Sequence, residues 1–427
     1  MSDPHSTYLA ELERAHRRNA ICFYADGFLF LFGLALVFPS TILAGFVHHF
    51  SGSASAAATL TAIFLTGMAL PQPFGAFLSH RRTRRKSLVV TLATLQKIPI
   101  FLLATFSLFA GQYAGIAVPV IFILFSVFSL FCGLVGPVWA DWIGRVIDPR
   151  RRGRTLGFRT FWMSLGGLCG ALVSQTLLER GGGRETYALL FHLAFISMSL
   201  TTACLILTVE MEFPRPTKVI RFVPFLKRLA TVLRENAAYR RYVLAMTLFF
   251  VTSIVPAVAI WFATHRFDAA DLDGWDPDRA AGRWNLVMWL VQALFGLAIG
   301  GHAQRHGPFP ALALFGLSAL AMPFLALLAP GPAWYSSVFV AFGVSQSAFF
   351  VAHLGTIYAL SPGEDRLPYL AASELLKVPV LLATLLGGAM LLDSGDPTMV
   401  AWVIGLSALA PLVGLAIMPR VARESGI

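Results

Sequence analysis

The sequence predicts an all-α membrane protein with twelve transmembrane helices in two pseudo-repeated six-helix bundles. Hydrophobic residues fill 57% of the 427 positions and charged residues only 13%, against about 45–50% and about 25% in soluble domains. Apolar runs long enough for a helix to cross a bilayer, about 20 residues, recur along the whole chain. This composition excludes a soluble globular protein, a disordered chain and a disulfide-rich scaffold.

Twelve apolar runs, separated by charged or Gly- and Pro-rich segments, account for the predicted helices. They fall at 20–46, 56–78, 88–110, 113–140, 156–178, 186–208, 242–265, 284–303, 310–329, 333–360, 369–392 and 398–418. Helices are expected because an isolated strand in lipid leaves its backbone polar groups unpaired. The runs also lack the ten-residue alternation of β-barrel strands.

A polar segment separates the sixth run from the seventh. The predicted organisation is an amino-terminal bundle, a cytoplasmic linker and a carboxy-terminal bundle at 1–208, 209–241 and 242–427. Within the linker, residues 222–233 form an amphipathic stretch with Lys227 and Arg228 on its polar face. We expect this stretch to lie on anionic lipid headgroups, with a partner-docking helix as the alternative.

The basic residues predict the orientation of the chain. Of the 33 Lys and Arg residues, 26 lie in connections on the side of the amino terminus and five on the opposite side; Lys97 and Lys377 lie inside runs. Because cytoplasmic loops collect Lys and Arg, both termini are expected in the cytoplasm. The net charge of +11 is therefore a topology signal, and nucleic acid is not an expected partner. No cleavable signal peptide is expected either, since the first twenty residues are polar.

The sequence contains no pattern typical of an enzyme, a cofactor site or a metal site. Its four cysteines lie inside apolar runs without metal-ligand spacing and are expected to be small buried hydrophobes: Cys22, Cys132, Cys169 and Cys204. The phosphate-binding P-loop, H-E-x-x-H and G-x-S-x-G motifs are missing. Chemistry driven directly by ATP hydrolysis is therefore not expected.

The two halves carry similar signals at corresponding places. A pair of arginines precedes the first run, at Arg17 and Arg18, and another precedes the seventh, at Arg240 and Arg241. A glycine followed by basic residues comes after the second run and again after the eighth. Two six-helix units in parallel repeat are a known transporter architecture, with a substrate site near mid-membrane.

These features resemble the major facilitator superfamily over essentially the full length of the chain. The signature of that family between spans 2 and 3 reads G-x-L-A-D-R-x-G-R-R/K. The second-half copy keeps three of its residues: Gly300, Arg305 and Gly307. The first-half copy keeps Gly75 and a run of basic residues, but Ser79 replaces the Asp and His80 replaces the Arg.

The resemblance implies a cytoplasmic gate, in which glycine lets helices approach closely and basic residues pair with acidic ones on neighbouring helices. Asp141 and Arg145, four residues apart at the end of span 4, suit such a role; a simple local helix pair is the alternative. The candidate gate residues are Gly75, Arg81, Arg82, Asp141, Arg145, Gly300, Arg305 and Gly307. Because Ser79 replaces the signature Asp, we expect the usual charge relay to be altered.

Span 5 carries a second, partial resemblance to this family. Gly157, Gly166 and Gly170 have the spacing G-x8-G-x3-G of its antiporters, with Ala171 where Pro would follow. Close helix packing explains the same glycines without reference to transport direction.

Four ionisable residues lie inside predicted spans, where a charge is costly unless it is paired or lines a wet cavity. Asp26 in span 1 is the first candidate for a proton-coupling carboxylate; the alternative is a permanently charged partner of a basic residue such as Lys97 in span 3. Glu374 and Lys377, one turn apart in span 11, either pair with each other or contact substrate or protons.

The resemblance implies a secondary active transporter of a small organic molecule that works by alternating access in a bacterial inner membrane. Proton coupling and export of an amphipathic or lipophilic cargo are expected, and the bilayer, the cargo and protons are the expected partners. An importer of a metabolite or siderophore is the alternative within transport. A non-transporting assembly or delivery factor is the alternative outside it, because the first-half signature is degraded.

Overall fold

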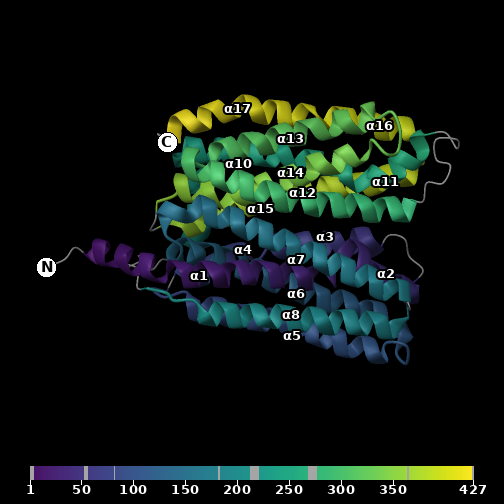
Figure 1. Ribbon diagram of the computed structural model, residues 1–427, viewed down its shortest axis with the longest axis horizontal. Helices are drawn as coiled ribbons and strands as arrows, with labels where there is room; N and C mark the ends of the chain where they lie inside the picture. Colours follow the sequence, from purple (N-terminus) through teal and green to yellow (C-terminus); the bar gives the residue numbers. More distant parts are fainter. Residues whose placement is uncertain are drawn as a thin grey trace. The chain divides into compact units, whose positions relative to one another are not determined.

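The computed structural model describes residues 4–51, 56–80, 82–180, 183–211, 221–267, 277–362 and 365–425. Every regular secondary-structure element in these segments is a helix (Figure 1). Eleven helical segments in the described part of the chain are long and apolar enough to cross a membrane. The predicted all-helical membrane fold is therefore confirmed.

The predicted first span is the run that does not appear among those eleven segments. The run at 20–46 extends over α1 (Pro4–Ala35), the π-helical turn η1 (Pro39–Leu43) and α2 (Ala44–Ser51). Its long first helix begins with a charged segment and carries Asp26, which lowers its mean hydropathy. The helix is nevertheless present where the sequence predicts it.

The chain divides into two compact units. Unit 1 contains the residues up to Thr155 together with Trp162–Ala230 and Ser361–Leu375. Unit 2 contains Leu156–Phe161, Thr231–Leu360 and the residues from Leu376 onward. The boundaries anticipated at 208 and 242 stay predictions.

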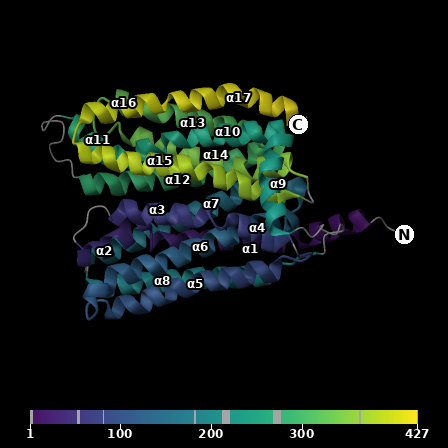
Figure 2. The same cartoon turned by 180° about the vertical axis from the view of Figure 1, so that it is seen from behind.

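In unit 1, the helices of the amino-terminal half lie alongside one another, except that Leu156–Phe161 within them belong to unit 2. After α2 they are α3 (Ala56–Ala69), α4 (Gln72–His80), α5 (Lys86–Phe109), α6 (Ala114–Val146), the 3-10 turn η2 (Pro149–Arg151), α7 (Arg152–Arg180) and α8 (Arg184–Leu207). Helix α8 packs between α1 and α5, and α6 packs against α5, α3 and α4 (Figures 1 and 2). The linker helix α9 (Phe222–Glu235) follows.

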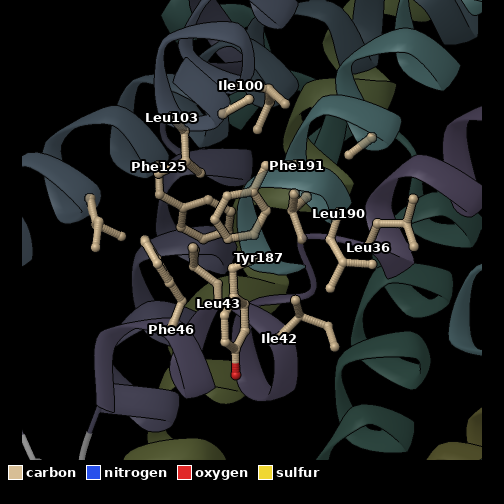
Figure 3. Close-up of a cluster of buried hydrophobic side chains, with 14 of the residues drawn as sticks. Leu36, Ile42, Leu43, Phe46, Ile100, Leu103, Phe125, Tyr187, Leu190 and Phe191 are labelled. Atoms are coloured by element: carbon tan, nitrogen blue, oxygen red, sulfur yellow. The ribbon is translucent and has the colours of Figure 1, made fainter. Parts of the chain in front are cut away.

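Aromatic and aliphatic side chains from α2, α5, α6 and α8 form the core of unit 1 (Figure 3). Phe46 lies 5.2 Å from Tyr187 and 5.3 Å from Phe191, measured between ring centroids. Phe125 is also fully buried in this cluster. Since lipid tails are as apolar as these side chains, the cluster stabilises the unit through close van der Waals packing.

Glycines in unit 1 mark the places where helices approach most closely. A side chain at Gly166 of α7 would run into the backbone of Phe28 on α1, and one at Gly75 of α4 would run into the backbone of Leu134 on α6. By contrast, no described atom beyond the neighbouring residues and backbone of its own helix lies within 4 Å of the position that a Cβ would take at Gly136 of α6.

We expect Gly166→Ala to lower the melting temperature, because the added methyl group forces α7 away from α1 at a cost of about 1–3 kcal/mol. Gly136→Ala is the matched control and is expected to stabilise by up to about 1 kcal/mol, the difference in helix propensity between Gly and Ala. Thermal unfolding of the two variants in detergent measures both effects. Equal shifts in the two variants would contradict the assigned helix contact.

Nine helical elements in the described part of the chain follow the linker, and they belong to unit 2 except for the residues of α15 up to Leu375, which belong to unit 1. They are α10 (Ala237–Phe250), the 3-10 turn η3 (Val251–Ser253), α11 (Ile254–Arg266), α12 (Pro277–His306), α13 (Phe309–Leu328), α14 (Ser336–Leu360), α15 (Arg366–Ser394), α16 (Pro397–Ser407) and α17 (Leu409–Ser425). Helix α14 packs against α12 and α13, and α10 packs against α17. The turn η3 interrupts span 7 as η1 interrupts span 1, so the first span of each half is broken.

Candidate functional site

A buried ion-pair network lies at the end of α6 in unit 1. Asp141 is 1% exposed and forms an ion pair with the fully buried guanidinium of Arg85. It also accepts a hydrogen bond from Nε of Arg145, one turn further along α6, at 3.1 Å. Burial lowers the pKa of Arg85 from its ordinary value, and the charge of Asp141 opposes that effect. One carboxylate thus neutralises two buried cations in part.

The start of α5 is held by a second carboxylate. Glu210 accepts hydrogen bonds from the backbone N–H of Arg85 at 2.8 Å and of Lys86 at 3.0 Å. A helix amino terminus presents unpaired N–H groups and a positive dipole end, so a carboxylate is stabilising there. Nζ of Lys86 donates to the carbonyl oxygen of Thr208 at 2.7 Å. These contacts fix the segment after α8 against the loop that supplies Arg85.

The amino-terminal part of α1 is tied to the same region. Oη of Tyr8 donates to the carbonyl oxygen of Arg145 at 2.7 Å. The amide of Asn19, fully buried, donates to the carbonyl oxygens of Val146 and Val209 at 3.0 and 2.9 Å and accepts from the N–H of Val209 at 2.8 Å. Burial raises the pKa of Tyr8, so its phenol remains a donor.

Basic side chains from other segments of unit 1 converge on the last turn of α6. The carbonyl oxygen of Gly144 accepts from Nη2 of Arg152 at 3.0 Å and from Nη1 of Arg366 at 3.1 Å. Arg228 of α9 forms an ion pair with Asp365 at 3.1 Å. The network therefore joins α6, α7, α9 and the beginning of α15 within one unit.

The first-half signature residues occupy different environments. Arg81 lies outside the described residues, whereas Arg82 is exposed and donates to Oγ of Ser87 at 3.3 Å. Ser79 is fully buried, and its hydroxyl has no hydrogen-bond partner among the residues that the structure describes. His80 is buried with its ring 5.7 Å from that of Phe225. Arg85, from the same basic run, pairs with Asp141 alongside Arg145, and the gate roles of Arg81 and Arg82 stay predictions.

The second-half signature residues lie at the end of α12. Gly300 is buried, and a side chain at Gly157 would run into its Cα atom, both being in unit 2. Arg305 is exposed. Gly307 has a φ of 77°, a left-handed conformation that glycine adopts without strain, and it ends the helix. Of the three span 5 glycines, Gly157 therefore packs against α12.

Asp26 and Lys97 lie buried together in the interior of unit 1. Their side chains are 7% and 4% exposed, and their charges interact. Asp26 precedes Gly33 by seven residues, which places both on one face of α1. Gly33 contacts Met198 of α8, so this face is directed toward α8. The structure thus brings Asp26 and Lys97 within reach of each other's charge, and the two alternative roles of Asp26, proton carrier or charge partner, stay predictions.

Lys377 lies in an aromatic cage in unit 2. Its residue is 3% exposed, and Nζ lies 4.9 Å from the ring centroid of Phe349 and 5.3 Å from that of Phe250. The two rings meet edge to face at 5.2 Å. Such distances allow cation–π attraction, which is strengthened where water is excluded. Glu374 is half-buried one turn earlier on α15.

A tyrosine–histidine pair adjoins this cage. Oη of Tyr242 lies 2.6 Å from Nδ1 of His353, and both residues are buried. The His353 ring stacks on Phe349 at 5.0 Å between centroids. Within the described residues, no group of three or more His, Cys, Asp or Glu residues is arranged to hold a metal ion.

Several members of these clusters were not identified as site residues from the sequence. They are Glu210, Tyr242, Phe250 and Phe349, together with the specific role of Arg85. The spacing of Phe349 and His353 by four residues was a usable signal, since it places both on one face of a helix. Nothing in the local sequence marks the contact between Glu210 and α5.

The helices and their buried charges define a multi-pass integral membrane protein. The sequence profile of the Major Facilitator Superfamily matches residues 27–367. The chain therefore belongs to this superfamily of secondary transporters, which confirms the resemblance drawn from the signatures and the topology. No curated protein sequence matches the chain significantly.

Solved structures show the same fold at low sequence identity. A bacterial homologue of the iron transporter ferroportin in an outward-facing state is 14% identical, with a TM-score of 0.70 over 95% of this chain and 99% of that chain. The proton:xylose symporter XylE bound to 6-bromo-6-deoxy-D-glucose is 16% identical, with a TM-score of 0.67 over 95% of each chain. The transporter FucP in the outward conformation is 14% identical, with a TM-score of 0.66 over 96% and 99%.

Proposed function

We propose that this protein is a proton-coupled exporter of a small amphipathic organic molecule. Membership in the superfamily supplies the class, a secondary transporter. The coupling, the cargo and the direction are the proposal. The observation that carries it is the pair of buried ionisable sites at membrane depth: Asp26 with Lys97 in unit 1, and Lys377 among aromatic rings in unit 2.

Asp26 is proposed as the proton-binding carboxylate and Lys97 as the residue that stabilises its ionised form. Both residues are almost fully buried. In such a site, protonation of a carboxylate beside one cation changes the electrostatic free energy of the site strongly. Ionisable residues inside membrane spans are proton-relay candidates for this reason. Glu374 is the second candidate carboxylate.

Lys377 is proposed to contact the cargo. A buried ammonium group favours a negatively charged partner, and the rings of Phe250 and Phe349 offer an apolar surface beside it. A cargo with an anionic group on an apolar body satisfies both features. A bacterial inner membrane and cytoplasmic termini are part of the proposal, and the bias of Lys and Arg supports this orientation.

Transport into membrane vesicles tests direction and function together. Everted vesicles that contain the protein are given an interior-acid pH gradient and a panel of labelled aromatic and aliphatic carboxylates with their primary amides. We expect at least one carboxylate to accumulate, and a protonophore to abolish the accumulation. Accumulation only in right-side-out vesicles would support the importer, and no accumulation in either would support a non-transporting factor.

Lys377→Gln is expected to lower the affinity for the transported carboxylate by about tenfold or more, because a charge-assisted contact contributes roughly 1.5–3 kcal/mol. Arg420→Gln is the matched control, since Arg420 is exposed at the end of α17 in the same unit. The concentration dependence of uptake measures the change. An unchanged affinity in Lys377→Gln would remove this residue from the cargo site.

A further inference from the structure

The linker helix α9 has two apolar stripes, and only one of them is buried in the protein. Phe225, Leu229 and Val232 recur at spacings of four and three and are at most 7% exposed. The second stripe starts with Val223 and Leu226, which are 62% and 40% exposed. A helix that is polar on its outer side would expose charged side chains at those two positions.

Aromatic contacts at the start of α9 hold it against α4 and the remains of the first-half signature. The ring of Phe222 lies 5.1 Å from that of Phe77 on α4, and the ring of Phe225 lies 5.7 Å from that of His80. The ion pair between Arg228 and Asp365 holds the same helix on another side. Helix α9 is thus fixed near the end of α4, while Val223 and Leu226 of the second stripe remain exposed.

Exposed cations border the second stripe. Lys227 follows Val223 by four residues and Arg234 follows Lys227 by seven, so both lie beside the exposed apolar side chains on one side of the helix. Arg221, immediately before α9, is also exposed. Apolar side chains flanked by Lys and Arg are typical of helices that lie in the interface of anionic bilayers.

We propose that α9 binds the surface of an anionic bilayer through this second stripe, with Val223 and Leu226 among the acyl chains and Lys227 and Arg234 at the headgroups. Charge complementarity argues for lipid, since the segment 209–241 holds eight of the 33 basic residues of the chain. The chain is already a membrane protein, so the bilayer is adjacent to the helix. The lipid then anchors the helix that packs on Phe77 and His80.

Lipid contact can be measured without any transport assay, in the full-length protein. Val223→Cys in a variant whose native cysteines are replaced by Ala is labelled with the fluorophore NBD and placed in nanodiscs of phosphatidylcholine with increasing phosphatidylglycerol. We expect doxyl-labelled lipids to quench the label, and the quenching to increase with the anionic fraction. Ile123→Cys, on an exposed part of α6 within a span, is the lipid control, and Thr83→Cys, in an exposed loop, is the water control.

The pair Lys227→Gln and Arg234→Gln is expected to remove the dependence on phosphatidylglycerol, because each basic residue near an anionic surface changes the binding equilibrium by about fivefold. The pair Arg180→Gln and Arg184→Gln makes the same charge change at exposed positions, at the end of α7 and the start of α8. This control pair is expected to leave the dependence on phosphatidylglycerol intact. Quenching of the label by aqueous iodide would overturn the proposal. Protection from both quenchers would overturn it as well, in favour of a protein partner.

Discussion

Replacing Asp141 with Asn is expected to lower the free energy of unfolding by about 3–5 kcal/mol, because the change leaves buried guanidinium groups without their carboxylate. Arg85 is fully buried and Arg145 is 3% exposed, so water cannot replace the lost carboxylate as the partner of either guanidinium group. Denaturant unfolding of the purified protein in detergent measures the loss. It is among the largest single effects that we expect in this chain.

Glu13→Gln is the matched control for this prediction. Glu13 also pairs with an arginine, Arg151, at 3.5 Å, but both side chains are more than half exposed. Surface pairs contribute at most about 1 kcal/mol, so this variant is expected to unfold almost like the wild type. Similar losses in Asp141→Asn and Glu13→Gln would contradict the assignment of Asp141 as the centre of a buried network.

Asp26→Asn is expected to abolish transport driven by a pH gradient and to lower the melting temperature as well. The first effect follows if the carboxylate carries the proton, and the second follows because Lys97 is left as an unpaired buried charge. Both effects are read from one preparation, by vesicle transport and by thermal unfolding.

A second variant separates the two roles. Asp26→Asn combined with Lys97→Met removes the unpaired charge and is expected to restore the melting temperature but not the response to a pH gradient. Recovery of pH-driven transport in this double variant would make Asp26 a structural charge partner only. An unchanged pH dependence in both Asp26→Asn and Glu374→Gln would likewise remove the proton assignment.

The sequence predicted the helices well because the physical constraint is strong. A bilayer of fixed thickness requires long apolar runs, and a charged residue inside a run is visible at once. Asp26, Lys97 and Lys377 were found in this way, and all three are buried. The pairing of Asp141 with Arg145 followed from helix periodicity, since residues four apart lie on one face.

Which face of each helix packs against the protein core could not be predicted equally well from the sequence. In a membrane span, the side chains that face lipid and the side chains that face the core are both apolar, so the hydrophobic pattern does not distinguish them. For this reason the direction of Asp26 toward α8 and the aromatic cage of Phe250 and Phe349 around Lys377 emerged only from the structure.

Contacts between segments that are distant along the chain could not be predicted from the sequence either. Glu210 binds the amino terminus of α5 across 125 positions of the chain, and Arg85, rather than Arg82, reaches Asp141. The basic run before α5 offered several equivalent arginines, and only the three-dimensional position of α6 decides between them. The same limit applies to His80 and Phe225, whose contact depends on where α9 docks.

Proton movement coupled to cargo movement is the most direct test of proton-coupled secondary transport. Purified protein is reconstituted in liposomes that contain a pH-sensitive dye, and a carboxylate that accumulates in the vesicle assay is added outside without an imposed pH gradient. We predict that its transport changes the internal pH in the wild type and leaves it constant in Asp26→Asn combined with Lys97→Met. Cargo movement in the wild type without any change of internal pH would contradict proton coupling.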